Sequence, residues 1–89
     1  MGMRLYQILI ERAARKALDR IEKPMRERIE GVIEALASDP RPPGCIHLTG
    51  VNAYRIRVGS YRIVYTVDDK VRIVTVTNVG HRRSIYREV

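Results

Sequence analysis

The chain has 89 residues, a formal net charge of +7, 45% hydrophobic residues and one cysteine. These totals are typical of one small folded domain, expected here over residues 1–89, and they exclude a disordered chain or a disulfide-bonded scaffold. Because the lone Cys45 fits a reducing compartment and no long apolar run occurs, the sequence favours a cytoplasmic protein without a membrane segment.

The N-terminal half of the chain predicts a strand followed by two helices. The strand is expected over residues 4–10. From residue 11 to residue 38 the apolar residues change to helical spacing, which Lys23 and Pro24 interrupt. Two helices joined by a short break form a hairpin that can cover one face of a sheet. The expected core positions are Leu5, Ile8, Ile10, Ala14, Ala17, Leu18, Ile21, Ile29, Val32, Ile33 and Leu36.

Turn-forming residues separate the helices from three further strands. Residues 39–44 (DPRPPG) contain three prolines and a glycine, which cannot continue a helix. Gly59-Ser60 joins two strands of alternating pattern, with glycine first as in a type II′ turn. Residues 71–79 are rich in β-branched residues and predict an inner strand that ends at Gly80. The predicted fold is α+β, in the order β-αα-βββ, with the helical hairpin packed on one face of a largely antiparallel four-stranded sheet.

Three arginines fall on one face of the predicted β-hairpin. Arg55 and Arg57 alternate with apolar residues in the first strand, and Arg62 follows the turn. Since side chains alternate between the two faces of a strand, closure of the hairpin at the turn brings these guanidinium groups to one side. We expect this side to face away from the helices, to be open, and to bind an anion.

The positive charge is concentrated in the strand-rich part of the chain. Residues 54–89 carry eight Lys and Arg against three Asp and Glu, whereas residues 1–53 carry nine against seven. This distribution favours a polyanion or an acidic partner. The alternative is a solvated basic surface that only aids solubility.

The residues that follow the last strand add further candidates. His81, Arg82 and Arg83 leave the strand end, and Tyr86 offers a ring for stacking or a phenol that donates a proton. Such a set fits RNA, because guanidinium groups stabilise a dianionic phosphorane and the 2′-hydroxyl attacks the adjacent phosphorus without metal or cofactor. The predicted catalytic residues are Arg55, Arg57, Arg62, His81, Arg82 and Tyr86, and Arg83 joins the arginines in RNA binding.

The same residues also have simpler structural explanations. The first-strand arginines can be ordinary exposed residues, Arg62 can pair with a helix glutamate, and Tyr86 can anchor the tail. Cys45 and His47 lack the spacing of a zinc site, so no metal is predicted. The hairpin tyrosines are expected in the core or at its rim rather than under bases: Tyr54, Tyr61 and Tyr65.

Several of these motifs together resemble the RelE/ParE superfamily of toxins from type II toxin–antitoxin systems. The resemblance spans almost the whole chain and is most specific in YRIRVGSYRIVY and VGHRRSIY. It implies a ribosome-dependent endoribonuclease that cuts mRNA in the A site, and a cognate RelB-like antitoxin that wraps the toxin.

Carried over by motif, the resemblance assigns basic site positions to Arg55, Arg57, Arg62 and Arg82, and the tail tyrosine to Tyr86. In well-known members the first two positions are lysines, one of them proposed as the general base. Arginine stays protonated in proteins, so Arg55 and Arg57 fit phosphate binding and not proton abstraction. His81 is then the candidate for proton transfer, because histidine titrates near neutral pH. Solvent is the alternative proton acceptor.

Two other functions remain open at this point. The ParE branch is similar in fold and inhibits DNA gyrase without cleaving RNA. A non-catalytic module whose basic face binds an acidic partner is the third possibility. The complete arginine and tyrosine set favours the RelE branch.

Overall fold

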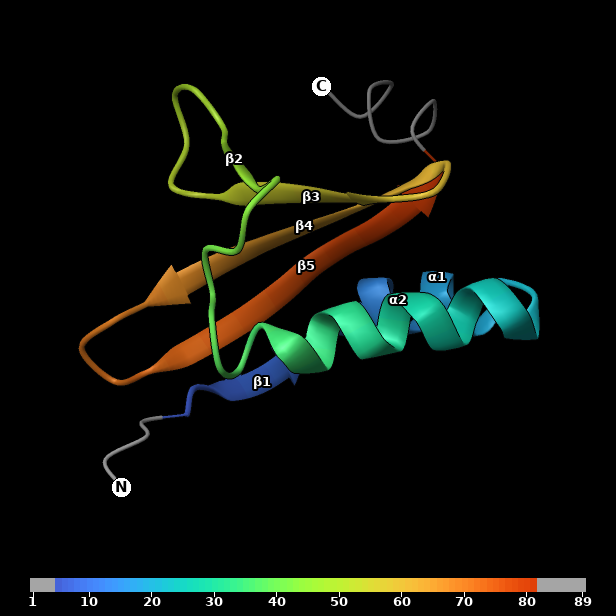
Figure 1. The fold of residues 1–89 in the computed structure, drawn as a ribbon, viewed down its shortest axis with the longest axis horizontal. Helices are drawn as coiled ribbons and strands as arrows, with labels where there is room; N and C mark the ends of the chain where they lie inside the picture. Colours follow the sequence, from blue (N-terminus) through green and yellow to red (C-terminus); the bar gives the residue numbers. More distant parts are fainter. Residues whose placement is uncertain (1–4, 82–89) are drawn as a thin grey trace.

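The computed structural model describes residues 5–81 (Figure 1). Their elements follow the predicted α+β order. They are β1 (Gln7–Ile10), α1 (Arg12–Asp19), α2 (Lys23–Ala35), β2 (Ile46–His47), β3 (Tyr54–Val58), β4 (Tyr61–Asp68) and β5 (Ile73–His81).

The two helices form where the apolar spacing predicted them. Leu18 of α1 and Ile29 and Ile33 of α2 are buried against the sheet. Pro24 lies in the first turn of α2, where its missing N–H leaves no hydrogen bond unmade. Both helices lie on the same side of the sheet (Figure 1). Within residues 5–81, no helix is long and apolar enough to cross a membrane.

The strands form a five-stranded sheet in the order β1-β5-β4-β3-β2, one strand more than predicted. Strand β1 runs parallel to β5, and the other pairs are antiparallel. The added strand, β2, is only two residues long and pairs Ile46 with Arg55 and His47 with Tyr54. Two residues carry no periodic pattern, so the sequence predicted no strand there.

The core lies between the helices and one face of the sheet. Its largest fully buried side chain is Tyr65 of β4, whose ring stacks on that of Tyr54 with centroids 5.7 Å apart. Tyr54 and Tyr61 pack at its rim, so the prediction that the hairpin tyrosines serve the core and its edge is confirmed. The alternation of β4 leaves Arg62 on the opposite face.

Two details differ from the sequence-based expectation. Leu5 precedes β1 and is 58% exposed, so it is not a core residue. Gly80 does not end the last strand, because β5 continues to His81 and Gly80 pairs with Arg62. A glycine weakens a strand but does not stop it when a neighbouring strand supplies backbone partners.

Candidate functional site

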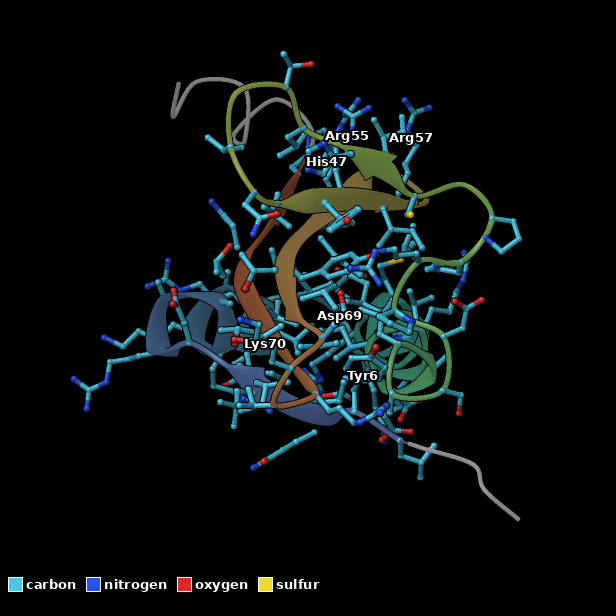
Figure 2. All side chains as sticks on the ribbon, turned by 90° about the vertical axis from the view of Figure 1, so that its left-hand side faces the viewer. Tyr6, His47, Arg55, Arg57, Asp69 and Lys70 are labelled. Atoms are coloured by element: carbon cyan, nitrogen blue, oxygen red, sulfur yellow. The ribbon has the colours of Figure 1, made fainter. Side chains whose placement is uncertain are left out.

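The β3–β4 hairpin brings the three predicted arginines to one side of the sheet. Val58 pairs with Tyr61, so the connection is the two-residue turn predicted, and its first residue, Gly59, has φ +60°. Arg57 lies directly opposite Arg62, and Arg55 lies two residues away on the same face of β3. We call this side, which faces away from the helices, the arginine face. Figure 2 shows Arg55 and Arg57 projecting from β3.

The three arginines differ in exposure. Arg57 is exposed and Arg55 is half-buried, whereas Arg62 is only 3% exposed. The prediction of an open Arg62 is therefore wrong. Strand β4 lies between β3 and β5, so neighbours flank Arg62 on both sides, with Arg57 opposite it on β3 and Gly80 on β5.

His81 is not brought to the arginine face. It pairs with Tyr61, and the two rings meet edge to face with centroids 5.6 Å apart. Directly paired residues share a face, so His81 lies on the helix side of the sheet. The other predicted site residues, Arg82, Arg83 and Tyr86, lie outside the described residues.

A pocket of about 340 Å³ opens beside the exposed end of β3. It lies between this strand and the segment that leads into β2. Two of its lining residues, Arg55 and Arg57, belong to the arginine face, and the others are Pro43, Gly44, Ile46 and Ile56.

A second polar cluster, which the sequence did not predict, joins the proline-rich loop to the β4–β5 turn. Arg41 donates two hydrogen bonds to the Asp69 carboxylate, at 2.8 Å and 3.2 Å, and its Nε donates to the Tyr54 hydroxyl at 2.9 Å. Tyr6 donates to the same carboxylate at 2.7 Å. We call Tyr6, Arg41, Tyr54 and Asp69 the Arg41 cluster. In Figure 2, Tyr6 and Asp69 lie well away from Arg55 and Arg57.

The hydrogen bonds of the Arg41 cluster shift the titration of its members. Those from Arg41 and Tyr6 lower the pKa of Asp69. The bond to Asp69 raises the pKa of Tyr6. Beside the cluster, burial raises the pKa of Tyr65, whose hydroxyl donates to the Pro40 carbonyl at 2.8 Å. The contacts of Arg41 and of Pro40 hold the proline-rich loop against the sheet, and the Tyr6 contact ties the segment before β1 to the β4–β5 turn, so the cluster is structural.

Metal-ligand side chains are dispersed through the part of the chain that the structure describes. Within residues 5–81, no three His, Cys, Asp or Glu side chains gather in a group that could hold a metal ion. The arginine face instead gathers guanidinium groups, a class of side chain that binds anions in proteins.

Comparison with solved structures shows the same fold in toxins that were crystallised with their antitoxins. The chain is 27% identical to the archaeal RelE–RelB complex from Pyrococcus horikoshii OT3, with a TM-score of 0.80, and the match covers 88% of this chain and 96% of that one. The intact Escherichia coli RelBE complex gives 28% identity and a TM-score of 0.75, covering 85% and 95%. The chain is 29% identical to the RelB–RelE complex from Methanococcus jannaschii, with a TM-score of 0.71, and the match covers 90% of this chain and 96% of that one.

Comparison of sequences points to the same group of proteins. A search of curated proteins found no significant match. Residues 8–86 match the family described as the ParE toxin of the type II toxin–antitoxin system parDE. This match covers most of the chain, and the fold agrees with RelE toxins, so the chain belongs to the RelE/ParE superfamily of type II toxin–antitoxin toxins.

Proposed function

We propose that this protein is a ribosome-dependent mRNA endoribonuclease of the RelE type, which inhibits translation. The observation that carries this proposal is the direct pairing of Arg57 with Arg62 across β3 and β4, with Arg55 on the same face. A guanidinium group donates paired hydrogen bonds to a phosphate, and the exposed Arg57 side chain is accessible to such a ligand. The RelE relatives at 27–29% identity support this branch.

In the proposed reaction, the 2′-hydroxyl of one nucleotide attacks the adjacent phosphorus, and the bond to the 5′-oxygen of the next nucleotide breaks. The products are a 2′,3′-cyclic phosphate and a 5′-hydroxyl. Arg55, Arg57 and Arg62 stabilise the negative charge of the pentavalent transition state. Arg82 joins them in this role, and Tyr86 donates the proton to the leaving oxygen.

His81 has a lesser role in this proposal. Its ring packs against Tyr61 on the helix side of the sheet, so the geometry favours solvent as the proton acceptor. We expect His81→Gln to slow single-turnover cleavage on programmed ribosomes by less than about threefold. Loss of a true general acid or base would instead slow cleavage by about 10²–10⁴-fold. A larger loss with a changed pH profile would restore His81 to the reaction.

We further propose a RelB-like antitoxin as the partner. The three relatives above were crystallised with RelB. The excess of positive charge after residue 53 fits an acidic antitoxin segment that covers the arginine face or the helical hairpin. Association should then slow as salt rises, because salt screens electrostatic steering.

A second candidate function is inhibition of DNA gyrase. The observation that favours it is the match of residues 8–86 to the ParE family. Both toxin functions predict a small antitoxin gene beside this one. A non-catalytic module that only binds an acidic partner does not.

Two parallel assays test the proposal. The purified toxin is added to a translation extract, and the mRNA is mapped by primer extension. The same preparation is added to purified gyrase in a supercoiling assay. We expect cuts in the ribosomal A site and unchanged supercoiling. Inhibited gyrase with intact mRNA would assign the ParE function. If neither assay shows an effect, the remaining candidate is the non-catalytic module that binds an acidic partner.

A further inference from the structure

We propose that the pocket beside β3 binds one nucleobase of a single-stranded RNA, while Arg57 binds the adjoining phosphate. This inference rests on the proposed RNase function and extends it, because it gives the toxin a surface that contacts the base as well as the backbone. It is carried by the volume of the pocket and by the chemical contrast between its apolar and its charged lining residues.

The pocket exists because β2 is short. Strand β2 pairs only with Tyr54 and Arg55, so within residues 5–81 no strand lies beside β3 from Ile56 to Val58 on that side. The chain before β2 instead turns, with the Cys45 N–H donating to the Pro42 carbonyl at 3.1 Å. The prolines of this segment have fixed φ angles, which restricts the backbone conformations of the wall that faces β3.

The walls and the rim of the pocket differ in chemistry. Pro43, Ile46 and Ile56 supply apolar walls, and Ile46 is 49% exposed. Arg55 and Arg57 supply the charged rim. The complementary ligand has a flat, largely apolar body joined to an anion, which describes a nucleotide. The volume of about 340 Å³ lies at the small end of the range of about 300–1,000 Å³ for small-molecule sites, so it suits one nucleotide.

The position of the pocket also limits the form of the RNA. A base can enter a pocket at a sheet edge only after it has left its stack, which single strands allow and duplexes resist. Arg57 belongs to both the pocket and the cross-strand pair with Arg62. A base in the pocket would therefore place its own phosphate next to Arg57, beside the cross-strand pair, and set the register of the RNA strand.

Binding of single nucleotides tests this inference without any cleavage. The full ¹⁵N-labelled chain is titrated with AMP, GMP, CMP, UMP and, as a probe without a base, ribose 5-phosphate. We expect nucleotides to shift the amide signals of Gly44, Ile46 and Ile56 as well as that of Arg57. Ribose 5-phosphate should shift only the arginines and bind about tenfold more weakly, because it buries no base.

Two matched variants locate the effect. Ile46→Ala should reduce the advantage of nucleotides over ribose 5-phosphate to about twofold or less. Val71→Ala removes a similarly exposed aliphatic side chain, 61% exposed in the β4–β5 turn, and should leave that advantage unchanged. Both positions are exposed, so both variants should keep the wild-type melting temperature, which is measured as a control.

Several results would overturn the inference. Equal affinities for nucleotides and ribose 5-phosphate would show that only phosphate is bound. Unmoved Gly44 and Ile46 signals would place the base elsewhere. Pocket shifts with N-acetyl-leucinamide but not with nucleotides would assign the pocket to a protein partner.

A ribosome assay separates this inference from the proposed function. If the wild type cleaves mRNA, Ile46→Ala should still cleave but with a flatter codon preference. If the wild type cleaves nothing while nucleotides fill the pocket, the RNase proposal fails and the pocket stands. If the wild type cleaves mRNA but nucleotides do not bind in the pocket, the pocket inference fails and the RNase proposal stands.

Discussion

Arg41 and Arg57 are both exposed, yet their surroundings differ in kind. Arg41, 40% exposed, is held by a paired hydrogen bond to Asp69 and by Tyr54, over whose ring it lies at 5.2 Å. Within residues 5–81 the Arg57 side chain makes no hydrogen bond or ion pair, and Arg57 pairs across the strands with another arginine. Exposure alone does not separate Arg41, which is held by internal partners, from Arg57, which we propose binds phosphate; the partners of the guanidinium group do.

Exchanging the two arginines for alanine gives the largest expected contrast. Arg57→Ala should slow mRNA cleavage by about 100-fold or more with little change in melting temperature, because it removes transition-state charge stabilisation and no internal contact. Arg41→Ala should do the reverse, lowering the melting temperature while cleavage persists. Single-turnover cleavage and thermal unfolding measure both effects, and equal loss of cleavage in the two variants would remove the distinction.

Arg62 lies between these extremes, since it is buried but belongs to the arginine face. Arg62→Ala should lose cleavage and also about 1–3 kcal/mol of unfolding free energy, because truncation leaves a cavity and breaks the contacts of the side chain. Arg62→Met keeps most of the volume and should recover part of the stability but none of the activity. Denaturant unfolding measures this difference, and a fully active Arg62→Met would exclude Arg62 from the site.

The turn that aligns Arg57 with Arg62 gives a smaller effect. Gly59 has φ +60°, and an added Cβ would lie 2.9 Å from Cε of Met25. Gly59→Ala should therefore cost about 1–2 kcal/mol of stability. The matched change Gly31→Ala lies in α2 with nothing within 4 Å of the new Cβ, and should add up to about 1 kcal/mol. Opposite signs in urea unfolding are expected, and a neutral Gly59→Ala would show that the turn relaxes freely.

The smallest effect concerns the pH dependence of the Arg41 cluster. The lowered pKa of Asp69 means that folding favours its ionised form. The resulting stability is present above the ordinary aspartate pKa of about 4 and is lost as the pH falls through the lowered folded value. Asp69→Asn should melt slightly below the wild type at pH 7, and the difference should shrink as the pH falls below the ordinary aspartate pKa of about 4. A difference that is independent of pH would contradict this account.

The fold was predicted from the periodicity of apolar residues, and the prediction was wrong where that periodicity is absent. The helices and the hairpin have long apolar patterns, and each was predicted. Strand β2 is too short for a pattern, and its pairing depends on the loop that precedes it. Leu5 is apolar, but it lies before the edge strand, where little covers it.

The candidate site was predicted in part for the same reason. Alternation along β3 and β4 placed the arginines on one face. Because the strand was expected to end at Gly80, its continuation to His81 was not predicted. This continuation places His81 on the other face. The Arg41 cluster has no local signal, because Arg41 and Asp69 are 28 positions apart and meet only after the sheet has formed.

The place of β5 in the sheet determines when during synthesis this molecule can be completed. It is the last strand that the structure describes in residues 5–81, yet it lies between β1 and β4 and pairs with both. Gln7 has no strand partner until Ile73 has been made. The sheet therefore cannot close before residues 73–76 have been synthesised, and pairing over such a distance in sequence is slow. For a toxin proposed to act on ribosomes, this delay separates the synthesis of each copy from its first opportunity to act.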